Sequence, residues 1–227
     1  MEQITKSASA KELVNKFEAF VVRLDCYQKA APGRAQISSS LQAVMRQVAE
    51  TKKKLYFVSN NDLVTREEYL ANLTTHLDQA SLPLRPTEND VYPASYLSAQ
   101  YLKHKYPSFT KVWYVGNNSL KTELENEGFT SHSAGTPDPF NDEPISIDKF
   151  NNYPMVDGIE ACVIGLDQQF NYTKLCLASL YIQNMKAKFI CTNNDPYIPI
   201  ANRHYPGTGS AVEAIQLTLN DERGSQL

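Results

Sequence analysis

Short apolar runs alternate along this chain with longer segments in which apolar residues recur every three or four positions. The runs have the length of buried strands, and the recurring segments have the period of amphipathic helices. Strands are predicted at residues 19–24, 54–58, 111–115, 161–166 and 188–191, with a further short strand at 129–131. Helices are predicted at residues 9–16, 41–48, 65–77, 94–103, 119–127, 172–185 and 211–219. This alternation predicts an α/β protein with largely parallel sheets and right-handed crossovers.

Polar residues mark several of the predicted helix ends. Ser9-Ala10-Lys11-Glu12 and Thr65-Arg66-Glu67-Glu68 each have the capping-box pattern, in which a hydroxyl and an acid three residues later satisfy free backbone amides. Residues 38–40 are serines and offer candidate N-caps, and Gly128 suits the position just after a helix. We therefore expect helices to begin at these three places and one to end before Gly128.

Two stretches break the alternation. Residues 134–157 carry four prolines together with many acids and amides, which predicts a long surface loop or linker near a domain or subdomain boundary. Residues 82–91 also contain prolines and are predicted to be a connection.

Composition narrows the class of protein. The chain has 22 basic and 25 acidic residues, a net charge of −3, so it gives no reason to expect nucleic acid or an anionic membrane as a partner. The first residues contain no apolar signal-peptide region, and no apolar stretch reaches the ~18 residues of a membrane span. We expect an intracellular protein, cytoplasmic or mitochondrial, without membrane insertion.

The spacing of the cysteines and histidines matches no metal-binding motif. Cys26, Cys162, Cys176 and Cys191 form no CxxC pair and lie in or beside apolar segments, which predicts buried, reduced thiols. The four histidines show no HxH or HxxxH spacing. The chain also lacks a P-loop and a Gly-x-Ser-x-Gly motif, so nucleotide triphosphatase and α/β-hydrolase chemistry have no support.

Polar groups follow the first two predicted strands at the point where each strand ends. Asp25 follows the first strand, and Ser59, Asn60 and Asn61 follow the second. Ligands of open α/β sheets collect at the carboxyl ends of strands. A carboxylate there can attack a phosphate ester, and hydroxyl and amide groups can cradle the phosphate. Each feature taken alone also suits an ordinary turn, so their function depends on their being brought together.

A third polar set occurs near the end of the chain. It comprises residues 192–195, Thr-Asn-Asn-Asp, and a Pro-Gly-Thr-Gly stretch at 206–209 that precedes the last helix. The glycines permit close backbone approach, but a single Gly-x-Gly also suits a tight loop.

Together these segments resemble the capped phosphatases of the haloacid dehalogenase superfamily, in the branch of 4-nitrophenylphosphatase, phosphoglycolate phosphatase and pyridoxal phosphate phosphatase. The resemblance covers roughly residues 11–220. The matching segments are Leu24-Asp25-Cys26-Tyr27-Gln28-Lys29-Ala30, Phe57-Val58-Ser59-Asn60-Asn61, and residues 112–116, 163–167, 171–175, 192–195 and 206–210.

The resemblance implies a domain organisation and roles for particular residues. It implies a partial parallel-sheet core at 1–87, an α/β cap at 88–220 and a tail at 221–227 that leads back toward the remaining core. Asp25 would be the nucleophile that forms an aspartyl-phosphate. The phosphate would be bound by Ser59, Asn60 and Asn61, and the cap's substrate loop would comprise Thr192, Asn193, Asp195, Gly207 and Gly209.

This sequence departs from the family where the chemistry would take place. The family has a second Asp as general acid and a glycine after it, whereas this chain has Tyr27 and Gln28. A phenol, with an unperturbed pKa of about 10, is a poor substitute for a carboxyl group. Loss of a positioned acid–base costs roughly 10²–10⁴-fold in rate. The family's Gly-Asp-x-x-x-Asp segment, which supplies Mg²⁺ ligands, does not occur before Leu227. We therefore expect at most a weak metal site at Asp25, no bound cofactor, and an incomplete core.

Two hypotheses follow. The first is a catalytically inactive phosphatase homologue that serves as a structural or interaction subunit, bound to a protein partner or to a second copy through its cap or its open core edge. The alternative is an active Mg²⁺-dependent phosphatase of small phosphate monoesters.

Overall fold

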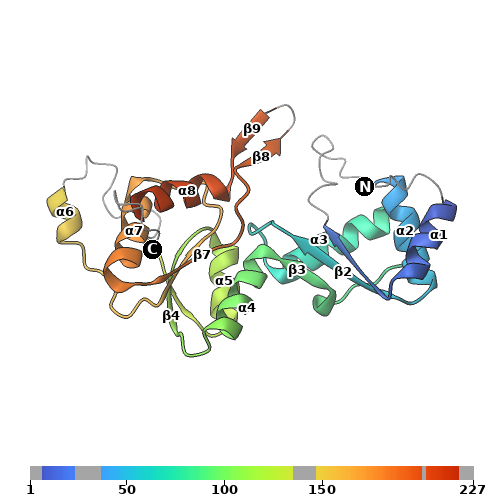
Figure 1. Ribbon diagram of the computed structural model, residues 1–227, viewed down its shortest axis with the longest axis horizontal. Helices are drawn as coiled ribbons and strands as arrows, with labels where there is room; N and C mark the ends of the chain where they lie inside the picture. Colours follow the sequence, from blue (N-terminus) through green and yellow to red (C-terminus); the bar gives the residue numbers. More distant parts are fainter. Residues whose placement is uncertain (1–6, 24–36, 135–146, 201–202, 220–227) are drawn as a thin grey trace.

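Two parallel sheets, each with its own helices, follow one another along the long axis of the molecule (Figure 1). The computed structural model describes residues 7–23, 37–134, 147–200 and 203–219. The sheet nearer the N-terminus is called the core sheet below, and the second is called the cap sheet. The α/β class and the parallel strands predicted from the sequence are confirmed.

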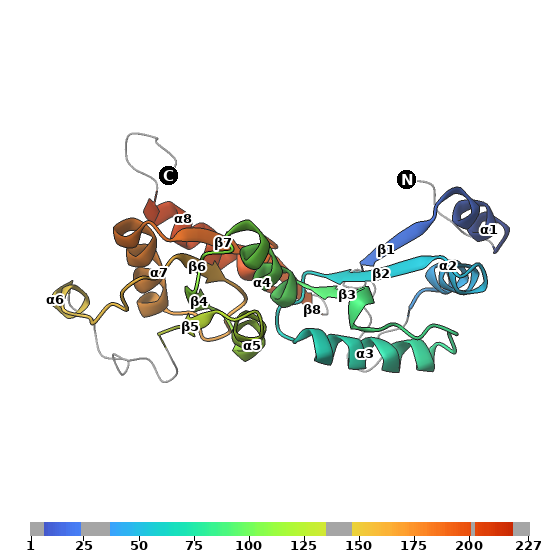
Figure 2. The same cartoon turned by 90° about the horizontal axis from the view of Figure 1, so that it is seen from below.

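The core sheet has three strands in the order β1 (Ala19–Arg23), β2 (Lys54–Ser59) and β3 (Val91–Pro93). Helices α1 (Ser7–Lys16) and α2 (Ser39–Glu50) pack together, and α3 (Arg66–Gln79) runs along the sheet (Figure 2). One apolar cluster joins these elements, and it includes Met45, Val48, Phe57, Leu73 and Leu77. Helix α3 buries Tyr69, Leu73 and Leu77, as its sequence period predicts.

Two of the three helices with a predicted N-terminal cap begin where the polar residues predict. The Ser38 hydroxyl accepts a hydrogen bond from the Leu41 amide at 3.3 Å. Thr65 and Glu68 form the predicted capping box, with bonds of 3.2 and 2.8 Å. The box predicted at Ser9 is wrong, because α1 already begins at Ser7 and includes Ser9. A serine in the first turn is compatible with a helix, so the motif alone does not set where a helix begins.

The cap sheet has four parallel strands and is covered on both faces. Its order is β5 (Thr130–His132), β4 (Lys111–Val115), β6 (Ala161–Ile164) and β7 (Lys188–Cys191). Alternate residues of β4 and β6 point to opposite faces, as strand geometry requires. Val112, Tyr114, Ala161 and Val163 pack with α4 (Ala94–Lys105) and α5 (Asn118–Asn126). Trp113, Val115, Cys162 and Ile164 pack with α7 (Tyr172–Met185) and α8 (Thr208–Leu219).

Five short elements were not predicted from the sequence. A 3-10 turn, η1 (Glu88–Asp90), and strand β3 lie in the stretch predicted as a plain connection or just after it. The antiparallel pair β8 (Tyr197–Ile200) and β9 (Arg203–Pro206) projects from the cap (Figure 1). Helix α6 (Ile147–Asn151) lies within the predicted loop. These elements are three to five residues long, and β3, β8 and β9 contain proline, so no period could be read from them.

The cysteines only partly match expectation. Cys162 is buried, Cys176 is half-buried and Cys191 is exposed, and all three are free thiols. The prediction that the thiols are buried is therefore wrong for Cys191, which sits at the end of β7. Cys26 lies outside the described residues. No helix in the described ranges is long and apolar enough to cross a membrane.

A pair of leucine substitutions tests the packing of the cap. Leu124 on α5 is completely buried, whereas Leu217 on α8 is 71% exposed. Leu124→Ala is expected to lower the free energy of unfolding by about 2–5 kcal/mol, because a cavity adds to the lost burial. Leu217→Ala should change it by less than about 0.5 kcal/mol. Urea unfolding followed by the fluorescence of Trp113, the single tryptophan of the chain, reports on this domain. Equal losses for the two variants would contradict the assigned packing.

Candidate functional site

The turn after β2 contains the three residues predicted to bind phosphate. Ser59 is buried, and its hydroxyl accepts a hydrogen bond from the Asn61 amide at 3.0 Å. The side-chain oxygen of Asn61 accepts in turn from the Leu63 amide at 2.9 Å. These local bonds fix a tight turn at the carboxyl end of the core sheet, where ligands of such sheets bind.

A loop of the cap lies directly against this turn. The side-chain amide of Asn60 donates to Asp195 Oδ2 at 2.8 Å, and Arg23 Nη2 lies 3.5 Å from the same oxygen. The side-chain amide of Asn193 donates to the Asn60 carbonyl at 3.0 Å and to Thr208 Oγ1 at 3.2 Å. Residues from three distant parts of the sequence therefore meet at one polar cluster, which we call the β2-tip cluster: Arg23, Asn60, Asn193 and Asp195.

The Pro-Gly-Thr-Gly stretch holds this cap loop in place. The Gly209 amide donates to the Asp195 carbonyl at 2.9 Å, and the Gly207 amide donates to the Pro196 carbonyl at 3.0 Å. A Cβ atom at Gly207 would collide with the Asp195 carbonyl, and one at Gly209 would lie 2.8 Å from the Asn194 carbonyl. Both glycines are thus required for close backbone approach, and their role in the structure is to position Asp195.

A buried carboxylate makes the second link between core and cap. Asp62 is only 2% exposed. Its Oδ2 accepts from the Leu166 amide at 2.8 Å, just beyond β6, and from the Thr192 hydroxyl at 2.5 Å, just beyond β7. Burial raises the pKa of Asp62, and the bonds from Thr192 and Leu166 oppose that rise. Gly165 leaves room for this contact, since a Cβ there would lie 2.8 Å from Asp62 Oδ2.

Further bonds tie the rest of the same segment, residues 61–66, to the cap. The Ala94 amide donates to the Asn61 carbonyl at 3.2 Å, and the Ser119 hydroxyl donates to the Leu63 carbonyl at 2.9 Å. The Arg66 amide donates to the buried Glu123, whose pKa is raised by burial. The segment after β2 is therefore fastened to α4, α5, β6 and β7 together.

The structure brings together most of the residues singled out from the sequence. Ser59, Asn60 and Asn61 lie beside Thr192, Asn193, Asp195, Gly207 and Gly209. Asp25 and Tyr27 lie outside the described residues. Sequence reasoning missed Arg23 and Asp62. Asp62 directly follows the Asn60-Asn61 pair. The signal that could have indicated it is an acidic residue in the short segment between the strand ending at Ser59 and the helix beginning at Arg66.

The described residues do not form a Mg²⁺ site. No three acidic, histidine or cysteine side chains gather there. The one acid of the β2-tip cluster, Asp195, faces an arginine and a side-chain amide donor. Mg²⁺ prefers several oxygen ligands, usually including carboxylates, so this donor set does not fit it.

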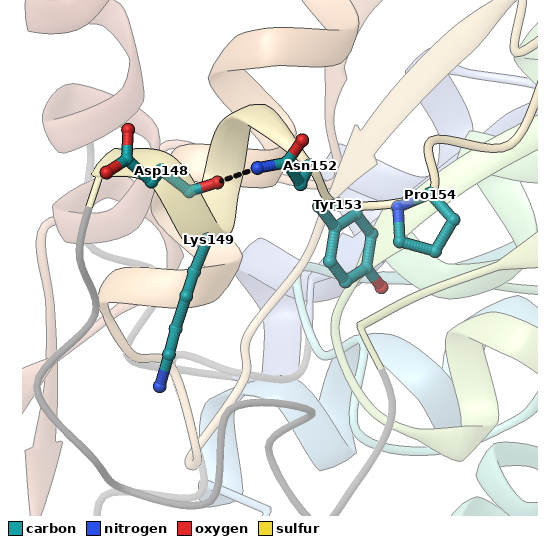
Figure 3. A pocket seen from close by; sticks show the side chains of 5 residues that line it. All are labelled: Asp148, Lys149, Asn152, Tyr153 and Pro154. Carbon is teal, nitrogen blue, oxygen red and sulfur yellow. Dashed lines mark hydrogen bonds between the residues drawn. The ribbon is translucent and has the colours of Figure 1, made fainter.

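A hollow of about 380 Å³ lies at α6 and is lined by Asp148, Lys149, Asn152, Tyr153 and Pro154 (Figure 3). The Asn152 side chain donates to the Asp148 carbonyl at 2.8 Å there. None of the residues that line this hollow belongs to the β2-tip cluster.

Comparison with known proteins identifies relatives of the chain. The family model of haloacid dehalogenase-like hydrolases matches residues 33–130. The 4-nitrophenylphosphatase of Schizosaccharomyces pombe is 28% identical over 211 residues, which cover 92% of this chain and 67% of that protein. The glycerol-3-phosphate phosphatase of Rattus norvegicus is 30% identical over 194 residues, which cover 84% and 57%. The chain thus spans roughly three fifths to two thirds of the length of these relatives.

Solved structures share the fold. A hypothetical protein from Pyrococcus horikoshii superposes with a TM-score of 0.68 at 21% identity, over 91% of this chain and 69% of that one. A p-nitrophenyl phosphatase from Archaeoglobus fulgidus gives a TM-score of 0.65 at 21% identity, over 90% and 66%. These likenesses support a core sheet joined to an α/β cap.

The buried carboxylate makes stability depend on pH in a defined direction. Because burial raises the pKa of Asp62 above its usual 3.8, folding binds a proton. The wild-type protein should therefore gain stability relative to Asp62→Asn as the pH falls from 7 through the raised pKa, and the gain should level off below about 3.8. Urea unfolding of both proteins at a series of pH values measures this difference.

The partner hydroxyl provides a second variant for this test. Thr192→Val removes a bond that lowers the pKa of Asp62, so in that background the gain should begin at a higher pH. The assignment would be refuted if the stability difference between the wild-type protein and the Asp62→Asn variant stayed constant with pH, or shrank as the pH fell.

Proposed function

Given that the chain belongs to the haloacid dehalogenase superfamily, we propose that it is a pseudophosphatase that acts as a structural or interaction subunit. Its relatives are named as phosphatases of phosphate esters. In this proposal the chain keeps the fold and the phosphate-binding turn of those enzymes, and it has lost the hydrolytic step.

One observation carries the proposal, namely the tyrosine at position 27. If residues 24–30 correspond to the first family motif, as their resemblance to it implies, Tyr27 stands at the position of the general acid. Protonating a leaving alcohol at neutral pH needs a group with a pKa near the working pH. A carboxyl group can be tuned to that range by burial, whereas a phenol begins at about 10.

The β2-tip cluster is consistent with this proposal. Asp195 accepts a hydrogen bond from Asn60 and lies 3.5 Å from Arg23, with 48% of its side chain exposed, and these contacts hold the cap loop against the turn after β2. The closed arrangement suits a stable scaffold. We propose in addition that the protein needs no metal cofactor for this role and acts inside the cell, in the cytoplasm or the mitochondrion.

The core sheet offers a surface for a protein partner. Strand β1 pairs with β2, and no other strand of the described residues lies along its second edge. Two apolar side chains in or just before β1 are exposed, Val21 at 66% and Phe17 at 52%. Parallel sheets are normally buried on both faces, and an open edge is a template for further pairing. We propose that a second copy of the chain or another protein covers β1.

Active phosphatase chemistry is the second candidate. The observation in its favour is the intact Ser59-Asn60-Asn61 turn, which is hydrogen-bonded and lies at the carboxyl end of β2. Under this alternative, Asp25 would form an aspartyl-phosphate, and Mg²⁺ would be held by Asp25 together with carboxylates that the described residues do not supply.

Hydrolysis assays separate the two candidates. The purified chain is expected to hydrolyse 4-nitrophenyl phosphate in the presence of Mg²⁺ no faster than its Asp25→Asn variant, because no carboxyl group stands at position 27. Initial rates with and without a chelator give the comparison. Mg²⁺-dependent turnover that disappears in Asp25→Asn would overturn the pseudophosphatase proposal and establish the alternative.

The assembly state tests the open edge. The wild-type chain is expected to sediment as a dimer or a larger species, and Val21→Lys should shift it toward the monomer, because a charge on an edge strand opposes pairing. Leu217→Lys, at a similarly exposed leucine far from the core sheet, is the control and should leave assembly unchanged. Sedimentation velocity measures both. A monomeric wild-type chain with a cooperative melt would remove this part of the proposal.

A further inference from the structure

The cap sheet has a topological switch point between β4 and β6. From β4 the chain passes through α5 to β5 on one side, and from β6 it passes through α7 to β7 on the other. Helices α5 and α7 accordingly cover opposite faces of the sheet. At such a point the loops after the two central strands diverge and leave a crevice at the carboxyl ends, and this is where open α/β sheets bind ligands.

A crevice of about 600 Å³ is present at this position. It is bordered by the loops after β4, β5 and β6, with Leu63 of the core on one side. Its volume lies within the range of about 300–1,000 Å³ that small-molecule sites occupy. The lining residues that carry polar side chains are Tyr114, Asn117, Asn118, Lys121, Ser133, Asp167, Gln168, Gln169 and Lys174.

Each of the two lysines in this lining lies beside a carboxylate, Lys174 beside Asp167 of the lining and Lys121 beside Glu125 outside it. Lys174 Nζ lies 2.6 Å from Asp167 Oδ2, and the two side chains are only 9% and 7% exposed. The other Asp167 oxygen accepts from the Gln169 amide at 2.8 Å. Lys121 is 3.8 Å from Glu125. Both cations thus have a carboxylate beside them, which disfavours a phosphate or carboxylate ligand.

Burial of the Lys174–Asp167 ion pair costs free energy, which a role in packing alone does not explain. Removing two charges from water carries a penalty that their attraction repays only with good geometry and further hydrogen bonds. Lys174 also stands in the first turn of α7, where the helix dipole disfavours a cation. The pair does, however, present fixed polar groups in the lining of the crevice.

The remaining polar lining consists of side-chain amides and hydroxyls, which both donate and accept hydrogen bonds. Asn118 and Gln168 are exposed at the crevice, and the ring of Tyr114 adds an aromatic side chain. From this chemistry, together with the compensated charge, we infer that the crevice binds a small neutral polyhydroxylated molecule, of the sugar or polyol class.

This crevice is distinct from the β2-tip cluster. The loops that border it follow β4, β5 and β6, whereas Asn193 and Asp195 follow β7. The Asp62 carboxylate lies between the two, bonded to Leu166 beside the crevice and to Thr192 beside the cluster. The inference does not depend on whether the protein hydrolyses phosphate esters.

Binding of defined probes to the full chain tests the inference. D-glucose, D-ribose and myo-inositol are titrated separately up to about 10 mM, and amide chemical shifts are followed by NMR, with inorganic phosphate as the anionic comparison. At least one neutral probe is expected to shift the amides of residues 117–118 and 167–169. Asn118→Leu and Gln168→Leu should each weaken that binding about tenfold.

A matched substitution shows whether replacing an asparagine of α5 by leucine affects binding through the helix itself. Asn126→Leu places the same change at the opposite, exposed end of α5 and should leave binding unchanged. Thermal melts of the three variants confirm that each is folded. The inference is overturned if no neutral probe shifts these amides, if phosphate alone does so, or if the crevice variants bind as tightly as the Asn126→Leu control.

Discussion

Burial of the Asp62 carboxylate is the constraint on which the rest of the arrangement depends. A buried charge must be hydrogen-bonded, and the donors that satisfy Asp62 come from Leu166 and Thr192, more than 100 residues away in sequence. The core segment that carries Asp62 therefore cannot adopt its observed position unless β6 and β7 are in place. Because Asn60 is two residues earlier, the same bonds also set how the turn after β2 meets Asn193 and Asp195.

Features that depend on neighbours in sequence were predictable. The capping box at Thr65 and the apolar face of α3 at Tyr69, Leu73 and Leu77 follow from contacts within one helix and its adjoining sheet. Strands β4 and β7 were predicted at their observed bounds, because their hydrophobic runs are bounded by polar turns. The position of Ser59-Asn60-Asn61 at the carboxyl end of a strand was predicted from the polar residues that follow an apolar run, whereas the contact of this turn with Asn193 and Asp195 joins two different sheets and was not predicted.

Features that depend on distant partners were not predictable. Nothing local distinguishes the buried Asp62 and Glu123 from ordinary surface charges, since the donors that meet them are 57 to 130 positions away in sequence. Arg23 was read as part of an apolar strand, yet its guanidinium reaches a cap residue 172 positions later. The short strands β3, β8 and β9 exist through pairing alone, so they have no periodic pattern to read.

The crossing from core to cap has a mechanical consequence. Pro93 is the last residue of β3 and the N-cap of α4, which begins at Ala94, so no linker residue separates the strand from the helix at this crossing. Pro93 is paired in register with Ser59, which fixes its position in the core sheet. Because one end of α4 is fixed to the core sheet at Pro93, a tilt of the helix by about 5° there would displace the far end of this ~18 Å helix by about 1.5 Å. Small changes of strand angle in the core are thus amplified into translations across the cap.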